Sequence, residues 1–171
     1  MIKNSKCAIF SDIHIGVHQD SSLWHNITLE WVKWFRAKCE DRNINDIIFC
    51  GDFFHYRDSI ATNTLSHASR VLDELADFNI TFITGNHDCY YKDTSDVNSV
   101  SILNNRDNLT VIEKLETIKT DDGKIISFVP WGIPVEDVPE SDIVFGHFEI
   151  QSFKLNSHKV CDDGISPTEI L

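Results

Sequence analysis

The sequence predicts a mixed α/β sandwich, and one short pattern that occurs four times is the main reason. Each copy is a mostly apolar run, then a Ser or Gly, then a polar side chain that can bind a metal: CAIFSD (7–12), IIFCGD (47–52), TFITGN (81–86) and DIVFGH (142–147). Apolar runs without polar alternation are typical of strands covered on both faces. Helix-like segments separate the first three runs, and this alternation of strand and helix indicates a parallel sheet.

The first helix is expected over residues 23–39, where apolar side chains recur every three or four positions: Trp24, Ile27, Trp31, Trp34 and Phe35. The second is expected over residues 62–78, with the same spacing in Leu65, Ala68, Leu72, Leu75 and Ala76. Aromatic side chains at helical spacing usually belong to a core. The three tryptophans of the first helix are therefore expected to pack against the sheet, with an interface to a second copy of the chain as the alternative for part of this stripe.

Beyond Asp88 the pattern is weaker. A short helix is expected around 97–103, and TIKTDDGKIISFV (117–129) predicts a hairpin that turns at Asp122 and Gly123. The chain has 171 residues with 42% hydrophobic and 11% aromatic content, which is enough for one folded domain over residues 1–171.

Composition also bears on location. No apolar run reaches the length of a membrane span, and the apolar start at 7–10 is too short for a signal peptide. The five cysteines form no CxxC pair and no zinc spacing, and their odd number fits a reducing compartment. We therefore expect a cytoplasmic protein with no membrane contact, in the host cytoplasm if it is viral, with Cys7 and Cys50 in the core.

The charge balance argues against a partner rich in phosphate. Fifteen Lys and Arg against 27 Asp and Glu give a net charge of −12. Residues 1–42 carry six basic and five acidic side chains, net +1, so the rest of the chain carries −13. Most of these carboxylates are expected on a solvated surface. The basic residues of the first helix are also read as a solvated face, in preference to a patch that contacts a nucleic-acid backbone.

Four polar side chains at the strand ends are expected to share one crevice: Asp12, Asp52, Asn86 and His147. In open α/β sheets, functional groups collect beyond the carboxyl ends of the strands, and the glycines at 51, 85 and 146 allow a sharp turn there. These side chains, together with His14, offer carboxylate, amide and imidazole ligands, a set that suits manganese, iron or zinc better than calcium or magnesium. GNHD (85–88) is the most specific of the motifs, because a structural loop has no need for Asn, His and Asp together.

These motifs carry a resemblance. SDIHIG (11–16), GDFFHYR (51–57), GNHD (85–88) and GH (146–147) resemble the first four motifs of the calcineurin-like metallophosphoesterase superfamily. Within it, GDFFH resembles the nuclease subunits of the SbcD type, which act in double-strand-break repair and recombination. VPWG, VFGHFEI and KVCDDGISPTEIL are most similar to the phage form, the small subunit of the recombination endonuclease. The resemblance covers nearly the whole chain and implies a β-sandwich flanked by helices.

The resemblance implies two divalent metal ions, with Mn²⁺ expected and Mg²⁺, Fe or Zn as alternatives. Asp12 and His14 would bind one ion, and Asn86 and His147 would bind the other. Asp52 would bridge both. In such a centre the two ions polarise a phosphodiester and supply hydroxide for in-line attack at phosphorus.

The same resemblance implies three catalytic residues. His87 would face the phosphate and support the leaving oxygen, with Asp88 orienting it. His55 would lie near the substrate. The alternative for His55 is a surface histidine at the start of a helix.

The fifth motif of the superfamily, GHxH, is absent. GHFE (146–149) matches the fourth motif, with Glu149 in place of the last histidine, and His158 is expected at the surface. The fold is therefore expected to be incomplete at its carboxyl-terminal end. The chain would be the amino-terminal part of a longer nuclease, without a DNA-contacting cap domain, and would bind Mn²⁺ poorly and cleave DNA slowly by itself.

The implied function is metal-dependent hydrolysis of DNA phosphodiester bonds by an exonuclease or endonuclease subunit. The implied partners are DNA, an ATPase subunit of the SbcC type whose contact region is expected to be missing here, and a second copy of the chain. One alternative is another metallophosphoesterase, such as a protein phosphatase or a small-molecule phosphodiesterase. Protein phosphatases of the superfamily carry GDxxDRG and GNHE, which this chain lacks. The other alternative is a fragment that folds and assembles without catalysis.

Overall fold

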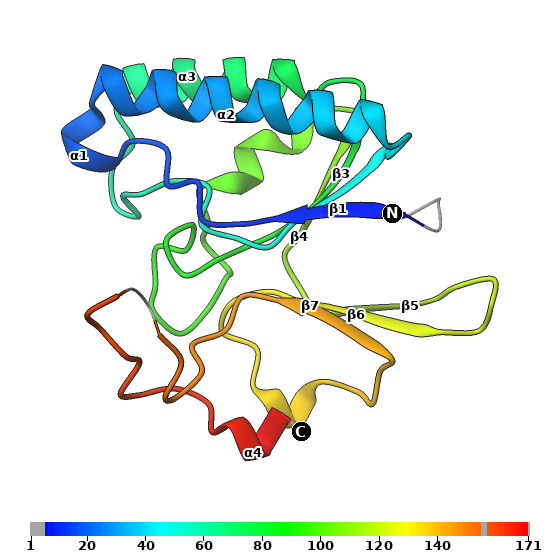
Figure 1. The fold of residues 1–171 in the computed structure, drawn as a ribbon. Helices are drawn as coiled ribbons and strands as arrows, with labels where there is room; N and C mark the ends of the chain where they lie inside the picture. The colour runs from blue at the N-terminus through cyan, green and yellow to red at the C-terminus, as the bar shows by residue number, and fades with distance from the viewer. Residues whose placement is uncertain (1–5, 155–156, 171) are drawn as a thin grey trace.

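The computed structural model describes residues 6–154 and 157–170. It has three layers (Figure 1): helices α2 (Ser22–Asp41) and α3 (Thr62–Glu74) cover one face of a four-stranded sheet, and a three-stranded sheet lies against the other face. The predicted mixed α/β sandwich is thus confirmed.

The four-stranded sheet is entirely parallel, in the order β1 (Cys7–Phe10), β2 (Asp46–Phe49), β3 (Asn79–Ile83) and β4 (Leu109–Ile112). Its first three strands are the three predicted runs, and the helices between them make the crossovers. The fourth strand was not anticipated from the sequence. Its four residues follow a polar stretch and pair with β3 in parallel register, from Leu109 opposite Ile80.

The three-stranded sheet consists of β5 (Glu116–Lys119), β6 (Ile125–Val129) and β7 (Ile143–Gly146). The first two strands form the predicted antiparallel hairpin, and Gly123 takes a φ of 89° in its turn. Strand β7, the fourth predicted run, pairs in parallel with β6. The polar side chain that follows β7 is therefore carried by the second sheet, unlike the other three.

Each face of the four-stranded sheet has its own core. On the helix side, buried side chains of α2 and α3 pack against residues such as Phe49 and Phe82. Between the sheets, Ile48, Ile83 and Ile112 meet Ile126 and Phe128 of β6. Strands covered on both faces explain why the sequence runs lack polar alternation. Cys7 and Cys50 pack, partly buried, against the core between the sheets, as expected.

The expectation for the tryptophans of the first helix is wrong for two of them. Trp24 and Trp34 are 41% and 55% exposed, and Trp31 is only partly buried. The helix buries a neighbouring stripe instead, made of His25, Leu29, Val32, Phe35 and Cys39. This stripe also has three- and four-residue spacing, so periodicity alone could not choose between the two faces.

Four short helices complete the described chain. A 3₁₀ helix, η1 (Val100–Asn105), lies close to the predicted short helix, and α1 (Val17–Asp20), η2 (Val135–Asp137) and α4 (Pro167–Ile170) were not anticipated. Among the described residues, no helix combines the length and apolar character needed to cross a membrane.

Candidate metal centre

The loops that follow β1 and β2 are hydrogen-bonded to each other. The backbone N–H groups of Asp12, His14 and Ile15 donate to the carbonyls of residues 51–53 at 2.7 to 3.1 Å. The N–H of His55 donates back to the Ile15 carbonyl at 3.0 Å. The two loops therefore extend the parallel pairing past the strands, and the polar side chains they carry are held at one edge of the sheet.

Three of the predicted ligands have a strained backbone. Asp12, His14 and Asp52 have φ values of 58°, 43° and 62°, in the left-handed region that L-residues rarely adopt. Such residues cost about 1–3 kcal/mol each and persist where the surrounding structure enforces them, often at functional sites. At these three positions the strained backbone carries side chains that meet at one place.

Two glycines allow the loops after β2 and β3 to touch through their backbones. A Cβ at Gly85 would lie 2.3 Å from Asp52 Oδ1 and 2.4 Å from its backbone nitrogen. A Cβ at Gly51 would lie 2.7 Å from Gly85 Cα and 2.8 Å from His147 Nδ1. Only glycine fits at either position, and the close approach brings Asp52 and Asn86 together.

Asp52 lies between two histidines. Its Oδ2 atom is 3.5 Å from His14 Nε2 and 3.6 Å from His147 Nε2. His14 Nε2 is also 3.8 Å from Asp12 Oδ1, and ligand atoms of Asp12, His14 and Asp52 all lie within 4.8 Å of one another. The Asp52 side chain is 4% exposed and that of Asp12 53%, so the group opens to solvent on the Asp12 side.

Asn86 completes the set. Its Oδ1 atom lies 2.9 Å from His147 Nε2 and faces the Asp52 carboxylate, while His147 Nδ1 donates to the Cys50 carbonyl at 2.8 Å. With its Nδ1 proton used in this way, a neutral His147 presents a lone pair at Nε2. A lone pair, an amide oxygen and a carboxylate then point at one another. A cation bound between them would satisfy all three groups. Without a cation, the Asn86 amide rotated by 180° would donate its N–H groups to His147 Nε2 and to the Asp52 carboxylate.

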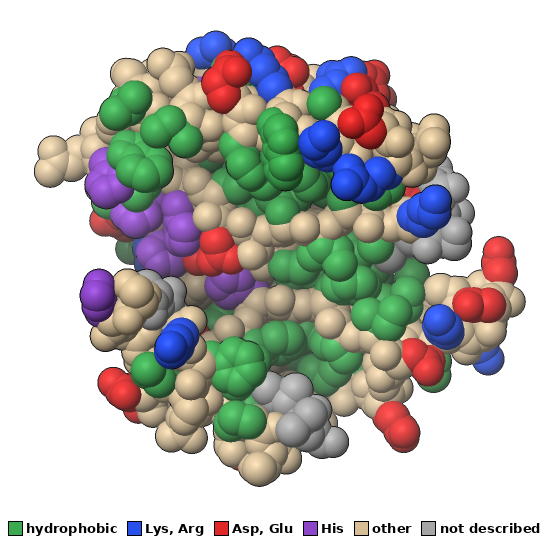
Figure 2. Space-filling model, viewed as in Figure 1, with side chains coloured by type: hydrophobic (Ala, Val, Ile, Leu, Met, Phe, Trp, Pro, Cys, Tyr) green, Lys and Arg blue, Asp and Glu red, His purple; other side chains and the backbone are tan. Residues whose placement is uncertain are grey.

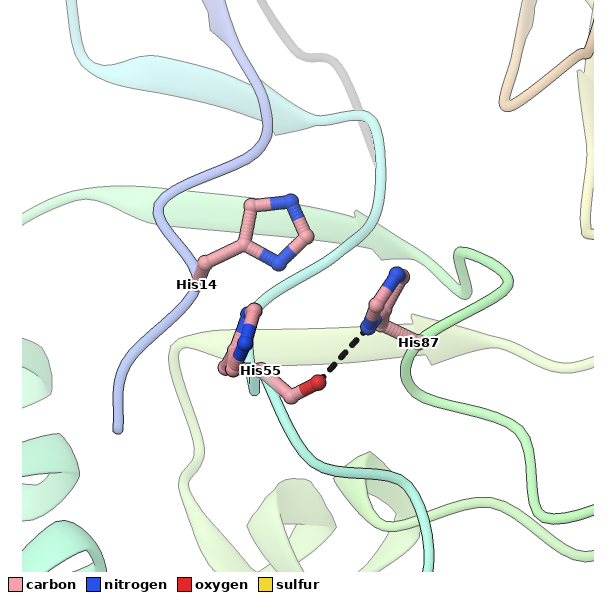
Figure 3. A group of neighbouring side chains, drawn as sticks. All are labelled: His14, His55 and His87. Carbon is pink, nitrogen blue, oxygen red and sulfur yellow. Dashed lines mark hydrogen bonds between the residues drawn. The ribbon is translucent and has the colours of Figure 1, made fainter. Parts of the chain in front are cut away.

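A second cluster joins His14 to His55 and His87 (Figure 3). Ring nitrogens of all three lie within 4.8 Å of one another. His87 Nδ1 lies 2.6 Å from the His55 carbonyl oxygen, which can only accept, so Nδ1 carries the proton and Nε2 is left for a ligand. His55 is half-buried, which is against the alternative of a surface histidine.

The sequence did not predict that these three histidines form one cluster. A signal was present, because each follows a predicted strand-end ligand by one to three positions: His14 after Asp12, His55 after Asp52 and His87 after Asn86. Loops that converge at one sheet edge bring together side chains at such matched positions.

The expected contact between Asp88 and the His87 ring is replaced by another arrangement. The buried Asp88 carboxylate accepts hydrogen bonds from the backbone N–H groups of Asp52, Phe53, Phe54 and Gly85 at 2.8 to 3.2 Å. The His55 carbonyl, not Asp88, fixes the His87 ring. Burial raises the pKa of Asp88 to about 6, although the hydrogen bonds from the backbone oppose this.

Burial favours the neutral form of two of the histidines. It lowers the pKa of His14, against the opposing effect of Asp52, and it lowers the pKa of His55, with His14 and His87 adding to the effect. The Nδ1 atoms of both rings are buried and lack a hydrogen-bond partner within the described residues. Neutral imidazoles with unused ring nitrogens are the form that binds metals.

The residues therefore fit a divalent cation by donor type. Carboxylate, amide oxygen and neutral imidazole are ligands of Mn, Fe and Zn. Figure 2 shows histidine side chains gathered at one side of the molecule, with an acidic group beside them. Two hollows of about 390 Å³ flank the site, one bordered by Asp12 and His14 and the other by His147 and Trp131.

Comparisons with known proteins identify the family. Residues 5–163 match the sequence profile of the family described as calcineurin-like phosphoesterase. Exonuclease subunit 1 of Enterobacteria phage T4 is 31% identical over 153 residues, which is 83% of this chain and 45% of that protein. A nuclease from Pseudomonas putida, nuclease MPE, has a similar fold, with a TM-score of 0.50 and 18% identity over 85% of this chain and 62% of its own. The chain thus spans less than half the length of its phage relative.

Proposed function

Because the chain belongs to the calcineurin-like phosphoesterases, a family of metal-dependent hydrolytic enzymes, we propose that it hydrolyses phosphodiester bonds of DNA. The observation that carries this proposal is the meeting of Asp12, His14, Asp52, Asn86 and His147 at one edge of the sheet. The similarity to a phage exonuclease subunit favours DNA as the substrate.

In this proposal the residues divide into two ligand groups with one shared member. Asp12 and His14 would hold one divalent ion, Asn86 and His147 would hold a second, and Asp52 would be shared by both. Manganese is the ion we expect. Bound ions would supply charge that offsets the phosphate and an activated water as nucleophile, so no protein nucleophile is required.

The other residues act on the phosphate and on the loops. The His55 carbonyl holds the His87 ring at Nδ1, so Nε2 is the atom that would donate a proton to the leaving oxygen. The His55 ring lies beside it and contacts the bound phosphate. Asp88 ties the loop of Asp52 to Gly85, so it positions the ligands and does not touch the substrate.

We propose that the chain works with a second kind of subunit. The phage relative is named as one subunit of an exonuclease, and an ATPase of the SbcC type is the partner we expect. Recombination and double-strand-break repair are the processes in which such a pair would act.

The exposed Trp34 on α2 is available for self-association. All five cysteines are free, which supports the cytoplasm as the place of action.

We also propose that this chain alone binds metal weakly. In this assignment each ion would receive two ligands of its own, one of them a histidine, and a share of Asp52, without the further histidine that a GHxH motif would bring to each. Catalytic metal sites depend strongly on ligand number and geometry. Cleavage by the isolated chain is then slow, and it rises with added Mn²⁺.

The test is a nuclease assay on the purified chain with end-labelled single- and double-stranded oligonucleotides. Slow cleavage is expected that requires Mn²⁺, stops with EDTA and is lost in Asp52→Asn and His87→Ala. Glu116→Gln, an exposed carboxylate on β5, is the matched control and should retain the activity.

Two results separate the parts of the proposal. Cleavage that survives both EDTA and Asp52→Asn would contradict the metal-dependent function. Rapid turnover at micromolar Mn²⁺ that His87→Ala abolishes would contradict weak binding alone and leave the function standing.

A further inference from the structure

A hollow of about 390 Å³ lies beside the metal centre, between the loop that follows β1 and the first turns of α2. We call it the Trp24 pocket, bordered at one end by Asp12 and His14 and elsewhere by His18, Trp24, Ile27 and Trp31. Its volume lies within the range of small-molecule sites. The pocket therefore shares two residues with the proposed ligands, and most of its other lining residues are aromatic or apolar.

Trp31 of this aromatic wall packs against the helix-side core, but Trp24 and Ile27 lie outside it. Trp24 and Ile27 are 41% and 47% exposed, whereas α2 buries the neighbouring stripe that contains Leu29 and Val32. Figure 2 shows this hydrophobic patch next to the gathered histidines. Large apolar side chains that stay exposed beside a polar site are typical of ligand-binding surfaces.

His18 is held over this wall by an unusual backbone. Its ring stacks on Trp24, with centroids 4.7 Å apart and planes 27° from parallel. Three successive residues, His18, Gln19 and Asp20, have φ values of 54°, 59° and 60°, and Gly16 precedes them at 101°. Such a left-handed run is rare outside glycine and marks a segment whose shape is imposed by its surroundings.

Buried contacts impose that shape. The Asp20 carboxylate accepts a hydrogen bond from the Thr64 hydroxyl of α3, and it lies 3.1 Å from His25 Nε2 of α2. Both His25 and Thr64 are buried. The loop between the metal residues and α2 is thus fixed at its far end, and the mouth of the Trp24 pocket has a defined form.

We propose that the Trp24 pocket binds the base of the nucleotide whose phosphate lies at the metal centre. This inference rests on the proposed function. A ligand that fits must have an anionic, metal-binding group at one end and a flat, mostly apolar group next to it, which is the form of a nucleotide. Stacking on aromatic side chains tolerates any base, so the pocket would serve DNA of any sequence once the base is unstacked.

The test compares two activated esters that differ in the base: thymidine 5′-(p-nitrophenyl phosphate) and methyl p-nitrophenyl phosphate. Trp24→Ala should raise the KM of the thymidine ester about tenfold relative to that of the methyl ester. Trp24→Phe should restore most of the ratio. Trp34→Ala, an exposed tryptophan of the same helix outside the pocket, is the matched control and should leave the ratio unchanged.

A binding measurement makes the test independent of turnover. Titration with thymidine 5′-phosphate, followed by tryptophan fluorescence, should quench the wild-type chain more than Trp24→Phe, and ribose 5-phosphate should have little effect on either. A KM ratio and a quenching response that Trp24→Ala and Trp34→Ala change equally would overturn the inference.

The two proposals fail in different ways. If both esters are hydrolysed with Mn²⁺ but Trp24→Ala leaves their KM ratio unchanged, the pocket inference is overturned and the phosphodiesterase function stands. If neither ester is hydrolysed at any metal concentration while thymidine 5′-phosphate still binds through Trp24, the pocket inference stands and the proposed function fails.

Discussion

The motif GNHD shows what adjacent residues in a sequence can and cannot reveal. The sequence suggested that Asp88 orients the neighbouring His87, but the two side chains face different surroundings. Asp88 points inward, where its two oxygens accept from four backbone N–H groups, and such a carboxylate can accept about four hydrogen bonds. His87 lies at the surface of the crevice, against the His55 carbonyl. The motif therefore joins His87, for which we propose a contact with the substrate, to Asp88, which holds the loops.

Gly85 gives the sharpest prediction for a single residue. Gly85→Ala would place a methyl group 2.4 Å from the backbone nitrogen of Asp52, and that backbone is held by Asp88 and cannot move aside. We expect a loss of more than about 3 kcal/mol in unfolding free energy, since overpacking against fixed backbone lies at the costly end of its range. Urea denaturation followed by circular dichroism measures it.

Gly123→Ala is the comparison for this experiment. Gly123 has a φ of 89°, so alanine is strained there, but the nearest atom to its Cβ would be 4.0 Å away, in the Lys119 side chain. The cost should be only about 1 kcal/mol. Equal losses for the two variants would show that the backbone approach at Gly85 is not rigid.

At the scale of the element, helix α2 has two apolar stripes, and only one belongs to the core. The choice depends on which way the helix is rotated about its axis, and that follows from its contacts with the sheet and α3, not from its own sequence. The exposed stripe, with Trp24 and Trp34, then needs a separate explanation, and the Trp24 pocket provides one for its amino-terminal half.

Two leucines of α2 test this rotation. Leu29 is 6% exposed and Leu23 is 66% exposed. Replacing each by alanine therefore compares the buried face of the helix with its exposed face. Leu29→Ala should lower the unfolding free energy by about 2–5 kcal/mol, since it leaves a cavity. Leu23→Ala should change it by less than about 0.5 kcal/mol. Urea denaturation of both variants gives the difference, and a larger loss for Leu23 would reverse the assignment of the faces.

A pair of buried histidines links α2 to α3. His25 and His67 are 5% and 3% exposed and stack with ring centroids 4.4 Å apart, and Asp20 of α1 lies against His25. Burial, with the nearby His25 and Arg70, lowers the pKa of His67 to about 4, so the folded protein keeps this ring neutral.

This pair predicts how stability depends on pH. Between pH 6.5 and 4 the unfolded chain binds a proton at His67 that the folded chain does not, so stability falls as the pH is lowered through this window. From pH 7 to 4.5 the wild type should lose about 2 kcal/mol more than His67→Gln, which has no titrating ring. Urea denaturation at the two pH values measures this difference, and equal losses would mean that His67 is protonated in the folded state.

At the scale of the whole molecule, most of the strands and the places of the proposed ligands at their ends were predictable, because apolar runs and the residues that follow them are local features. Asp12, Asp52 and Asn86 could be placed at one sheet edge from the order of strands and helices alone. Their partner His147 comes from the other sheet, and its approach to Asp52 depends on how the two sheets pack. Strand β4 and the left-handed turn at His18 were missed, because neither has a periodic pattern in the sequence.

Because the proposed ligands come from two sheets, metal binding should be coupled to folding. The five proposed ligands lie between positions 12 and 147 and meet only when both sheets are formed, so an ion held by all five would bind the folded chain in preference to the unfolded one. Mn²⁺ at 100 times its dissociation constant should raise the unfolding free energy by about 2.7 kcal/mol, and EDTA should reverse the effect.

His14→Ala is the variant that decides whether the ion binds at the proposed centre. The chain carries 27 acidic residues, and any exposed cluster of them could bind Mn²⁺ weakly. Removing His14 takes one ligand from the centre and leaves that surface charge unchanged, so most of the stabilisation should be lost at the same metal concentration. Thermal denaturation with and without Mn²⁺ measures it for both proteins. A shift of equal size in the two would place the bound metal on the acidic surface and remove the main support for a phosphodiesterase centre.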